Sequence, residues 1–99
     1  MEVIRLISYD IEEDRYRSRI SKYLHEEGFV RIQYSVYAGS GDYRRLNQIK
    51  TRIKDKLSNS RGRYSIFYTS IDLATFQEDY QGYVPILFYL THRIEQVYF

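Results

Sequence analysis

The feature that most constrains the fold of this chain is a strand-sized segment near its start that is apolar on both faces. Successive side chains of a strand point to opposite sides. In residues 2–10, apolar side chains occupy both sides: Ile4 and Leu6 on one, and Val3, Ile7 and Tyr9 on the other. Such a strand is usually central in its sheet and covered on both faces. The rest of the fold must therefore supply two covering layers.

Two amphipathic helices are predicted after this strand. The first spans Asp14–Glu27, where apolar residues recur at helical spacing, and Gly28 then suits the left-handed position that follows a helix. The second runs from Tyr43 to about Leu57, with Asp42 as its N-cap. Both helices have one apolar stripe, so each is expected to pack on a sheet through a single face.

Two further strands are predicted from alternation and composition. Residues 30–37 alternate between apolar and polar side chains, and the strand is expected to continue towards Ala38 and break at residues 39–41. Arg63–Ile71 is rich in β-branched and aromatic residues. The order is strand, helix, strand with a bulged continuation, helix, strand. This order predicts an α+β, ferredoxin-like βαββαβ sandwich with two helices on one face of an antiparallel sheet.

The length of 99 residues fits a single domain. We expect its core in residues 2–71 and a C-terminal extension in 72–99. Within the extension, Asp72–Tyr80 is predicted to form a short helix, and Val97–Phe99 a terminal strand that needs a partner edge. Because both predicted helices cover the same face, the second apolar face needs another cover. A second copy of the chain is the economical candidate; a half-exposed apolar face is the alternative.

Composition excludes several classes of protein. The chain has no cysteine, so disulfides and thiolate metal sites are excluded. No apolar run approaches the roughly 18 residues that a membrane span requires. The N-terminus lacks the pattern of a signal peptide. These observations predict a cytoplasmic protein that does not associate with membranes.

Basic residues are concentrated in one stretch. Residues 43–63 hold eight lysines and arginines against one acid, Asp55. A solvated helix face is the usual explanation for such a run, but most of these cations have no acid near them in the sequence. A phosphate-binding surface is therefore predicted on the second helix. Its candidate nucleic-acid contacts are Arg44, Arg45, Lys50, Arg52 and Lys54.

Asp10 is the candidate catalytic acid because it ends the first strand, where a side chain is held rigidly at the sheet rim. Asp10 could instead cap the first helix, although the acids at positions 12–14 are better placed for that role. Mg²⁺ often uses only one or two carboxylates, together with water and substrate phosphate. A two-fold dimer would supply a second Asp10. We therefore expect Mg²⁺, or Mn²⁺, at this residue.

Three short segments resemble the CRISPR-associated protein two family, small nucleases that accompany the integrase in spacer acquisition. They are Ile7-Ser8-Tyr9-Asp10-Ile11, Arg17-Ser18-Arg19, and Arg31-Ile32-Gln33-Tyr34-Ser35-Val36-Tyr37. The resemblance runs from about residue 3 to 71. It implies a ferredoxin-like fold, a face-to-face homodimer, a divalent metal between paired strand-end aspartates, and a C-terminal strand lent to the neighbouring subunit.

The resemblance also implies roles for individual residues. Tyr9, Arg17, Arg19 and Arg31 match family positions linked to activity or nucleic-acid contact, and the arginines are expected to hold the substrate backbone. Ser35 is expected to orient substrate or water, as is Tyr9. At position 37 the family usually has phenylalanine, so Tyr37 keeps the ring and adds a hydroxyl. The predicted catalytic set is therefore Asp10, Tyr9, Arg17, Arg19, Arg31, Ser35 and Tyr37.

The leading hypothesis is a metal-dependent endonuclease that cleaves RNA or DNA and assembles with integrase subunits. A second is a dimeric scaffold without catalysis that lays duplex DNA across its basic helices. A third is a toxin ribonuclease similar to virulence-associated protein D. A fourth, a ligand-binding regulator of the same fold, is disfavoured because the chain has no Gly-rich effector loop. Phosphate contacts do not distinguish RNA from DNA, so the nucleic acid stays open.

Overall fold

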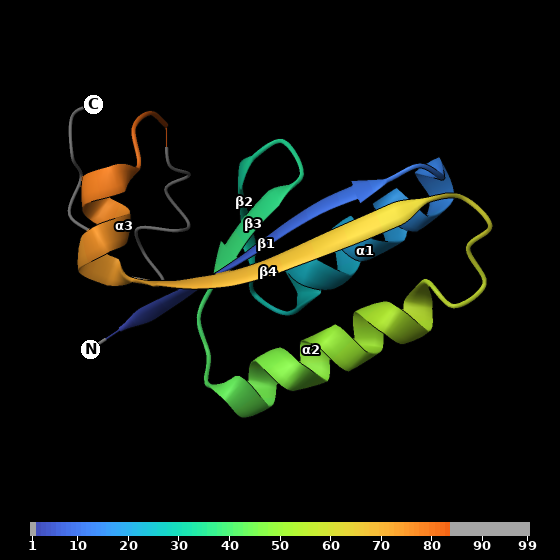
Figure 1. The fold of residues 1–99 in the computed structure, drawn as a ribbon, viewed down its shortest axis with the longest axis horizontal. Helices are drawn as coiled ribbons and strands as arrows, with labels where there is room; N and C mark the ends of the chain where they lie inside the picture. Colours follow the sequence, from blue (N-terminus) through green and yellow to red (C-terminus); the bar gives the residue numbers. More distant parts are fainter. Residues whose placement is uncertain (1, 84–99) are drawn as a thin grey trace.

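A computed structural model describes residues 2–83 of the chain as one four-stranded sheet with three helices (Figure 1). In chain order the elements are β1 (Val3–Ile11), α1 (Asp14–Glu26), β2 (Val30–Gln33), β3 (Val36–Gly39), α2 (Tyr43–Lys56), β4 (Tyr64–Asp72) and α3 (Leu73–Asp79). The strand order is β2-β3-β1-β4, and each neighbouring pair is antiparallel. This is the order of a ferredoxin-like sheet, with β1 in its interior as the sequence predicted.

Both long helices begin where the sequence predicted and end one residue before the predicted position. α2 is capped by Asp42, whose carboxylate accepts a hydrogen bond from the Arg45 backbone N–H at 2.9 Å. α1 ends before Gly28, which has a φ of 85°. A left-handed backbone of this kind costs glycine little because it has no Cβ.

The main core lies between the sheet and α1 and α2. Ile7, Ile20 and Leu24 are completely buried there, and Ile49 and Ile53 of α2 are nearly so. Tyr9 and Ile11 of β1 face the same core, together with Ile7. This face therefore contains most of the buried apolar surface that stabilises the fold.

A second, smaller cluster covers part of the opposite face. Ile4 of β1, Val30 and Ile32 of β2 and Ala38 of β3 are buried there together with Phe76 of α3. The short helix expected in Asp72–Tyr80 is confirmed, but it supplies cover that the sequence analysis assigned entirely to a second copy of the chain. It also extends the packed core beyond residue 71.

The cover from α3 does not reach the whole second face. Phe67 of β4 pairs with Ser8 of β1 on this side, and 67% of Phe67 is exposed. The predicted terminal strand Val97–Phe99 lies outside the described residues. Homodimerisation through this face stays a prediction.

The strand predicted over residues 30–37 is two strands of a hairpin, and this prediction was wrong. β2 ends at Gln33, the chain turns at Tyr34 and Ser35, and β3 returns antiparallel to it. Ser35 has a φ of 61°, the left-handed conformation that such a tight turn requires. The break therefore falls at residues 34–35, ahead of the glycines at 39 and 41.

Among residues 2–83, no helix is both long enough and apolar enough to span a bilayer.

Candidate functional site

At the end of β1, the side chains of two candidate residues point to opposite faces of the sheet. Tyr9 points into the helix-covered core, where its ring stacks on Tyr37 with centroids 5.9 Å apart. Asp10 points to the other face and is exposed. The strand period of two dictates this separation. The predicted catalytic set is therefore divided between two sites.

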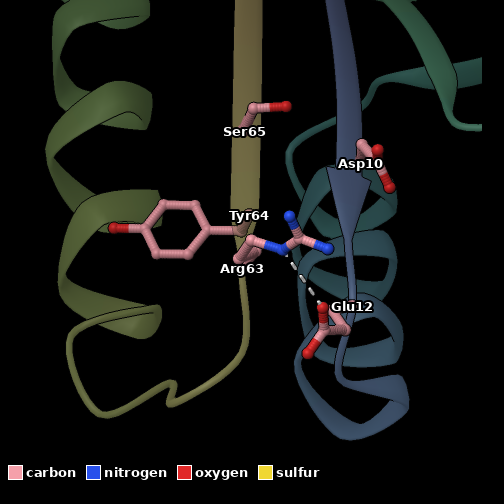
Figure 2. A pocket seen from close by; sticks show the side chains of 5 residues that line it. All are labelled: Asp10, Glu12, Arg63, Tyr64 and Ser65. Carbon is pink, nitrogen blue, oxygen red and sulfur yellow. Dashed lines mark ion pairs between the residues drawn. The ribbon is translucent and has the colours of Figure 1, made fainter.

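Asp10 lies in an open hollow of about 490 Å³ where β1 ends beside the start of β4 (Figure 2). Ser65 is its cross-strand partner, and Glu12, Arg63 and Tyr64 complete the lining. Figure 2 shows the side chain of Arg63, the residue just before β4, extending towards Glu12, and its Nε lies 3.6 Å from a Glu12 carboxylate oxygen. No residue in the described range 2–83 pairs with the Asp10 carboxylate, so its oxygens are available to a ligand.

One chain supplies only part of a magnesium site here. Asp10 offers a free carboxylate, whereas Glu12 is already paired with Arg63. Among residues 2–83 no group of three His, Cys, Asp or Glu side chains could hold a metal. A hard cation that keeps several waters can bind through one or two carboxylates. The residues fit Mg²⁺ if a further ligand comes from substrate phosphate or from a second chain.

Arg17 supports the end of β1 through its guanidinium. Its Nε donates to the Ile11 carbonyl and one terminal nitrogen to the Glu12 carbonyl, both at 3.1 Å. The other terminal nitrogen lies 2.7 Å from Asp14. All three nitrogens are engaged, so Arg17 is placed to fix the backbone after Asp10.

Glu13 fixes the loop that leads into β4. One carboxylate oxygen accepts hydrogen bonds from the Gly62 N–H at 2.5 Å, the Arg61 N–H at 2.6 Å and the Ser60 hydroxyl at 2.9 Å. These bonds, the Gly62 one first, lower the pKa of Glu13. A Cβ at Gly62 would lie 2.9 Å from Glu13 Cγ, so only glycine fits this approach. The clamp positions Arg63 and Ser65 beside Asp10.

A second, cationic pocket of about 340 Å³ lies on the other side of β1. Its lining comes from α1, from the β2–β3 turn and from Tyr9. The structure gathers here the predicted residues Tyr9, Arg17, Arg31 and Ser35, and adds Ser18, Ser21, Lys22 and Tyr34. The signal for the α1 members was present in the sequence, since positions 18, 21 and 22 share one helix face.

Tyr37 lies beneath this pocket and is completely buried. Its hydroxyl forms a 2.5 Å hydrogen bond with the Ser21 hydroxyl. Burial, followed by the hydrogen bond with Tyr37, raises the pKa of Tyr9 to about 12. Tyr9 therefore keeps its proton at neutral pH and can donate a hydrogen bond, but it cannot serve as a ready base.

Arg19 belongs to neither site. Its guanidinium carbon lies 5.2 Å from the centroid of the Tyr16 ring, and Arg15 lies 5.1 Å from the same centroid. The two arginines therefore flank one tyrosine of α1. The structure does not bring Arg19 to Asp10.

The five cations predicted on α2 do not share one face. Arg45 contacts the carbonyl and the carboxylate of Glu27, the residue that follows α1. Arg44 and Arg52 line a hollow on the outer side of the helix. Lys50 and Lys54 are four residues apart and share another side, and the Lys50 ammonium lies 5.2 Å from the Tyr68 ring centroid. Four of the five remain available to a polyanion.

Comparisons with known proteins agree with this fold. The sequence model of the family described as "CRISPR associated protein Cas2" matches residues 1–79. CRISPR-associated endoribonuclease Cas2 1 of Methanospirillum hungatei is 41% identical over 49 residues, which are 50% of this chain and 52% of that protein. CRISPR-associated endoribonuclease Cas2 of Thermofilum pendens is 34% identical over 53 residues, 54% of this chain and 57% of that one. The chain thus spans about half the length of these curated relatives.

A solved structure has the same fold. The crystal structure of a hypothetical protein, TT1823, from Thermus thermophilus matches with a TM-score of 0.55 and 23% identity. The match covers 70% of this chain and 83% of that one.

Proposed function

Because the chain belongs to the CRISPR-associated Cas2 family, we propose that it is a metal-dependent endonuclease of spacer acquisition, acting on RNA or DNA as a homodimer that assembles with integrase subunits. The relatives named as endoribonucleases support the nuclease part of this proposal. The observation that carries it is the Asp10 carboxylate, which is exposed at the rim of the sheet. No other residue in 2–83 forms a hydrogen bond or an ion pair with it.

Asp10 of each subunit would hold Mg²⁺ or Mn²⁺. When bound, such an ion lowers the pKa of a coordinated water and neutralises charge on the scissile phosphate. Arg63 shares the hollow with Asp10 and is the cation best placed to contact that phosphate. Arg17 keeps the backbone at Ile11 and Glu12 in place, which fixes the direction of the Asp10 side chain.

Arg31, Tyr9 and Ser35 have a different part in this proposal. They line the pocket on the other side of β1. They would therefore contact the substrate strand at a distance from the scissile bond. Positioning of this kind contributes to catalysis without contact with the reacting atoms. Arg19 has no part in it.

The variant Asp10→Asn tests the proposal because it keeps the shape of the side chain and removes its charge. We expect cleavage of RNA or DNA with Mg²⁺ to fall at least about 100-fold, the order that loss of a single key catalytic group produces. Asp79→Asn, at the exposed end of α3, is the matched control and should cleave normally. Full cleavage by the Asp10 variant would refute the metal role.

A second function, as a scaffold for duplex DNA without catalysis, is favoured by the four available cations of α2. Duplex binding through phosphates depends on charge and not on base sequence. Reversing Arg44 and Lys50 to Glu should weaken duplex binding steeply and leave cleavage of short substrates unchanged. If both variants bind duplex DNA as tightly as the unmodified protein, the cations of α2 are only solvated surface charges, and the scaffold function is refuted.

A further inference from the structure

The cationic pocket on the helix side of β1 has the size and the charge of a site for a small anion. Its volume of about 340 Å³ lies at the lower end of the range for small-ligand pockets. Three cations line it, and no acid does. Arg17 is engaged with β1, but neither Lys22 nor Arg31 forms an ion pair with any residue in 2–83. Two uncompensated cations therefore face the same space.

Hydroxyl groups complete the lining. Ser18 and Ser21 lie three residues apart on α1, and Ser35 comes from the facing turn. The backbone carbonyl of Ser35 accepts a hydrogen bond from the Tyr9 N–H at 3.0 Å, which ties the turn to β1. The Ser21 hydroxyl is oriented from below by the buried Tyr37 hydroxyl. Hydroxyls and cations held together in this way are suited to phosphate oxygens.

An aromatic ring stands at the mouth of the pocket. Tyr34 is 76% exposed, and the Arg31 guanidinium carbon lies 5.8 Å from its ring centroid. The tight turn through Ser35 presents Tyr34 outward, away from the core. Exposed aromatic rings beside cations are the surfaces on which proteins stack the bases of single-stranded nucleic acids. A duplex could not offer a base to this ring without opening.

We propose that this pocket binds one unpaired nucleotide of a single-stranded nucleic acid, with its phosphate between Lys22 and Arg31 and its base on the Tyr34 ring. The inference rests on the proposed nuclease function and adds to it a subsite that holds one base and one phosphate of the strand. The pocket is separate from the Asp10 hollow, so it positions the strand and leaves the hydrolysis to the other face.

Binding of a labelled six-nucleotide single strand, measured in EDTA so that no cleavage occurs, tests the inference. Tyr34→Ala should weaken binding by at least about fivefold, the lower limit for loss of one stacked base, while Tyr34→Phe should bind normally. Lys22→Gln should weaken binding and reduce the slope of log affinity against log salt by about 0.7, the value for one phosphate contact on a single strand. Lys22→Arg should restore both the affinity and the salt slope of the unmodified protein.

Lys56→Gln removes the same charge from the last turn of α2, at a lysine that is not among the candidate nucleic-acid contacts, and is the matched control. It should change single-strand binding less than about twofold, whereas the pocket variants should leave duplex binding unchanged. Equal losses in all the lysine variants would mean that the strand is held by general charge, and would overturn the inference. So would displacement by inorganic phosphate together with normal binding by Tyr34→Ala, because the pocket would then take free phosphate.

The two proposals fail separately. Cleavage by Asp10→Asn with Mg²⁺ tests the nuclease, and strand binding in EDTA tests the pocket. Loss of cleavage in Asp10→Asn with normal strand binding by Tyr34→Ala and Lys22→Gln would leave the nuclease standing and remove the pocket. The reverse pattern would keep the single-strand site and remove the catalytic acid. RNA and DNA strands of the same sequence, compared in the same assay, identify the preferred nucleic acid.

Discussion

The two faces of the sheet differ in how completely this chain covers them. On one face, α1 and α2 bury Ile7, Ile20 and Leu24 completely. On the other, α3 helps to bury Ile4, but Phe67 is 67% exposed. Both faces include side chains of the same strand, β1, which alternate between them. The difference teaches that one face is built to stabilise the chain itself, whereas part of the other stays apolar and exposed, as the proposed homodimer requires.

The largest effect is expected from Ile7→Ala, which removes a completely buried side chain from the helix-covered face. Loss of the side chain and the cavity that remains should lower the free energy of unfolding by about 2–5 kcal/mol, measured by urea denaturation. Phe67→Ala on the other face should change the stability of the monomer by less than about 0.5 kcal/mol. A loss in the Phe67 variant equal to that of Ile7→Ala at high dilution would mean that both faces are packed within one chain.

The uncovered part of the second face gives the next prediction. Phe67→Asp places a charge on that apolar surface, and it should weaken self-association at least about tenfold, as loss of an interface anchor does. Analytical ultracentrifugation over a range of protein concentrations measures this. Ser58→Asp, in the exposed loop after α2, adds the same charge elsewhere and should associate normally. If Phe67→Asp dimerises normally, the two sheets do not meet face to face.

The order of helices and strands was predictable because local signals and the fold agree. Asp42 and Gly28 mark helix ends through the hydrogen bonds and backbone angles that helix ends require. The β2–β3 hairpin was missed because the alternation continues through it: a two-residue turn alone would reverse its phase, and the register shift between Arg31 and Gln33 restores it. Val30, Ile32, Val36 and Ala38 all pack in the second cluster, as they would in one continuous strand. Ser35, unlike glycine or asparagine, gives no signal for a left-handed turn.

The candidate site was predictable in its members but not in their arrangement. Strand alternation already separates Tyr9 from Asp10, a consequence that the family resemblance obscured by grouping them. The engagement of Arg17 with two backbone carbonyls depends on tertiary contact between α1 and the end of β1. The proximity of Arg63 to Asp10 depends on the pairing of β1 with β4, and no short-range pattern encodes it.

A smaller effect is expected at Tyr37 on the helix-covered face, whose hydroxyl forms a hydrogen bond with the Ser21 hydroxyl. Tyr37→Phe removes the hydrogen bond to Ser21 and keeps the ring, so the free energy of unfolding should fall by about 0.5–1.5 kcal/mol. Tyr34→Phe removes a hydroxyl from an exposed ring and is the control, with an expected change within about 0.5 kcal/mol. An unchanged Tyr37→Phe protein would show that water replaces the lost partner.

The smallest effect is expected at the edge of the covered face, where Glu13 clamps the loop into β4. Its hydrogen bonds lower the pKa of the folded carboxyl below its ordinary value of 4.5. The unfolded chain therefore binds the proton more readily, and the stabilisation is present above pH 4.5 and lost as pH falls through the lowered folded pKa. Asp72, whose pKa is lowered chiefly by the Thr75 N–H, has the same dependence.

Comparison of Glu13→Gln with the unmodified protein isolates the Glu13 part of this dependence, since Asp72 contributes equally to both. The difference in unfolding free energy between the two proteins, followed by urea denaturation from pH 7 to pH 3, should be constant above about pH 5 and shrink below it. If the difference in unfolding free energy stays constant down to pH 3, the charge of Glu13 has no part in joining the β4 loop to the helix-covered face. The Glu13 side chain would then act through its shape and hydrogen bonds alone.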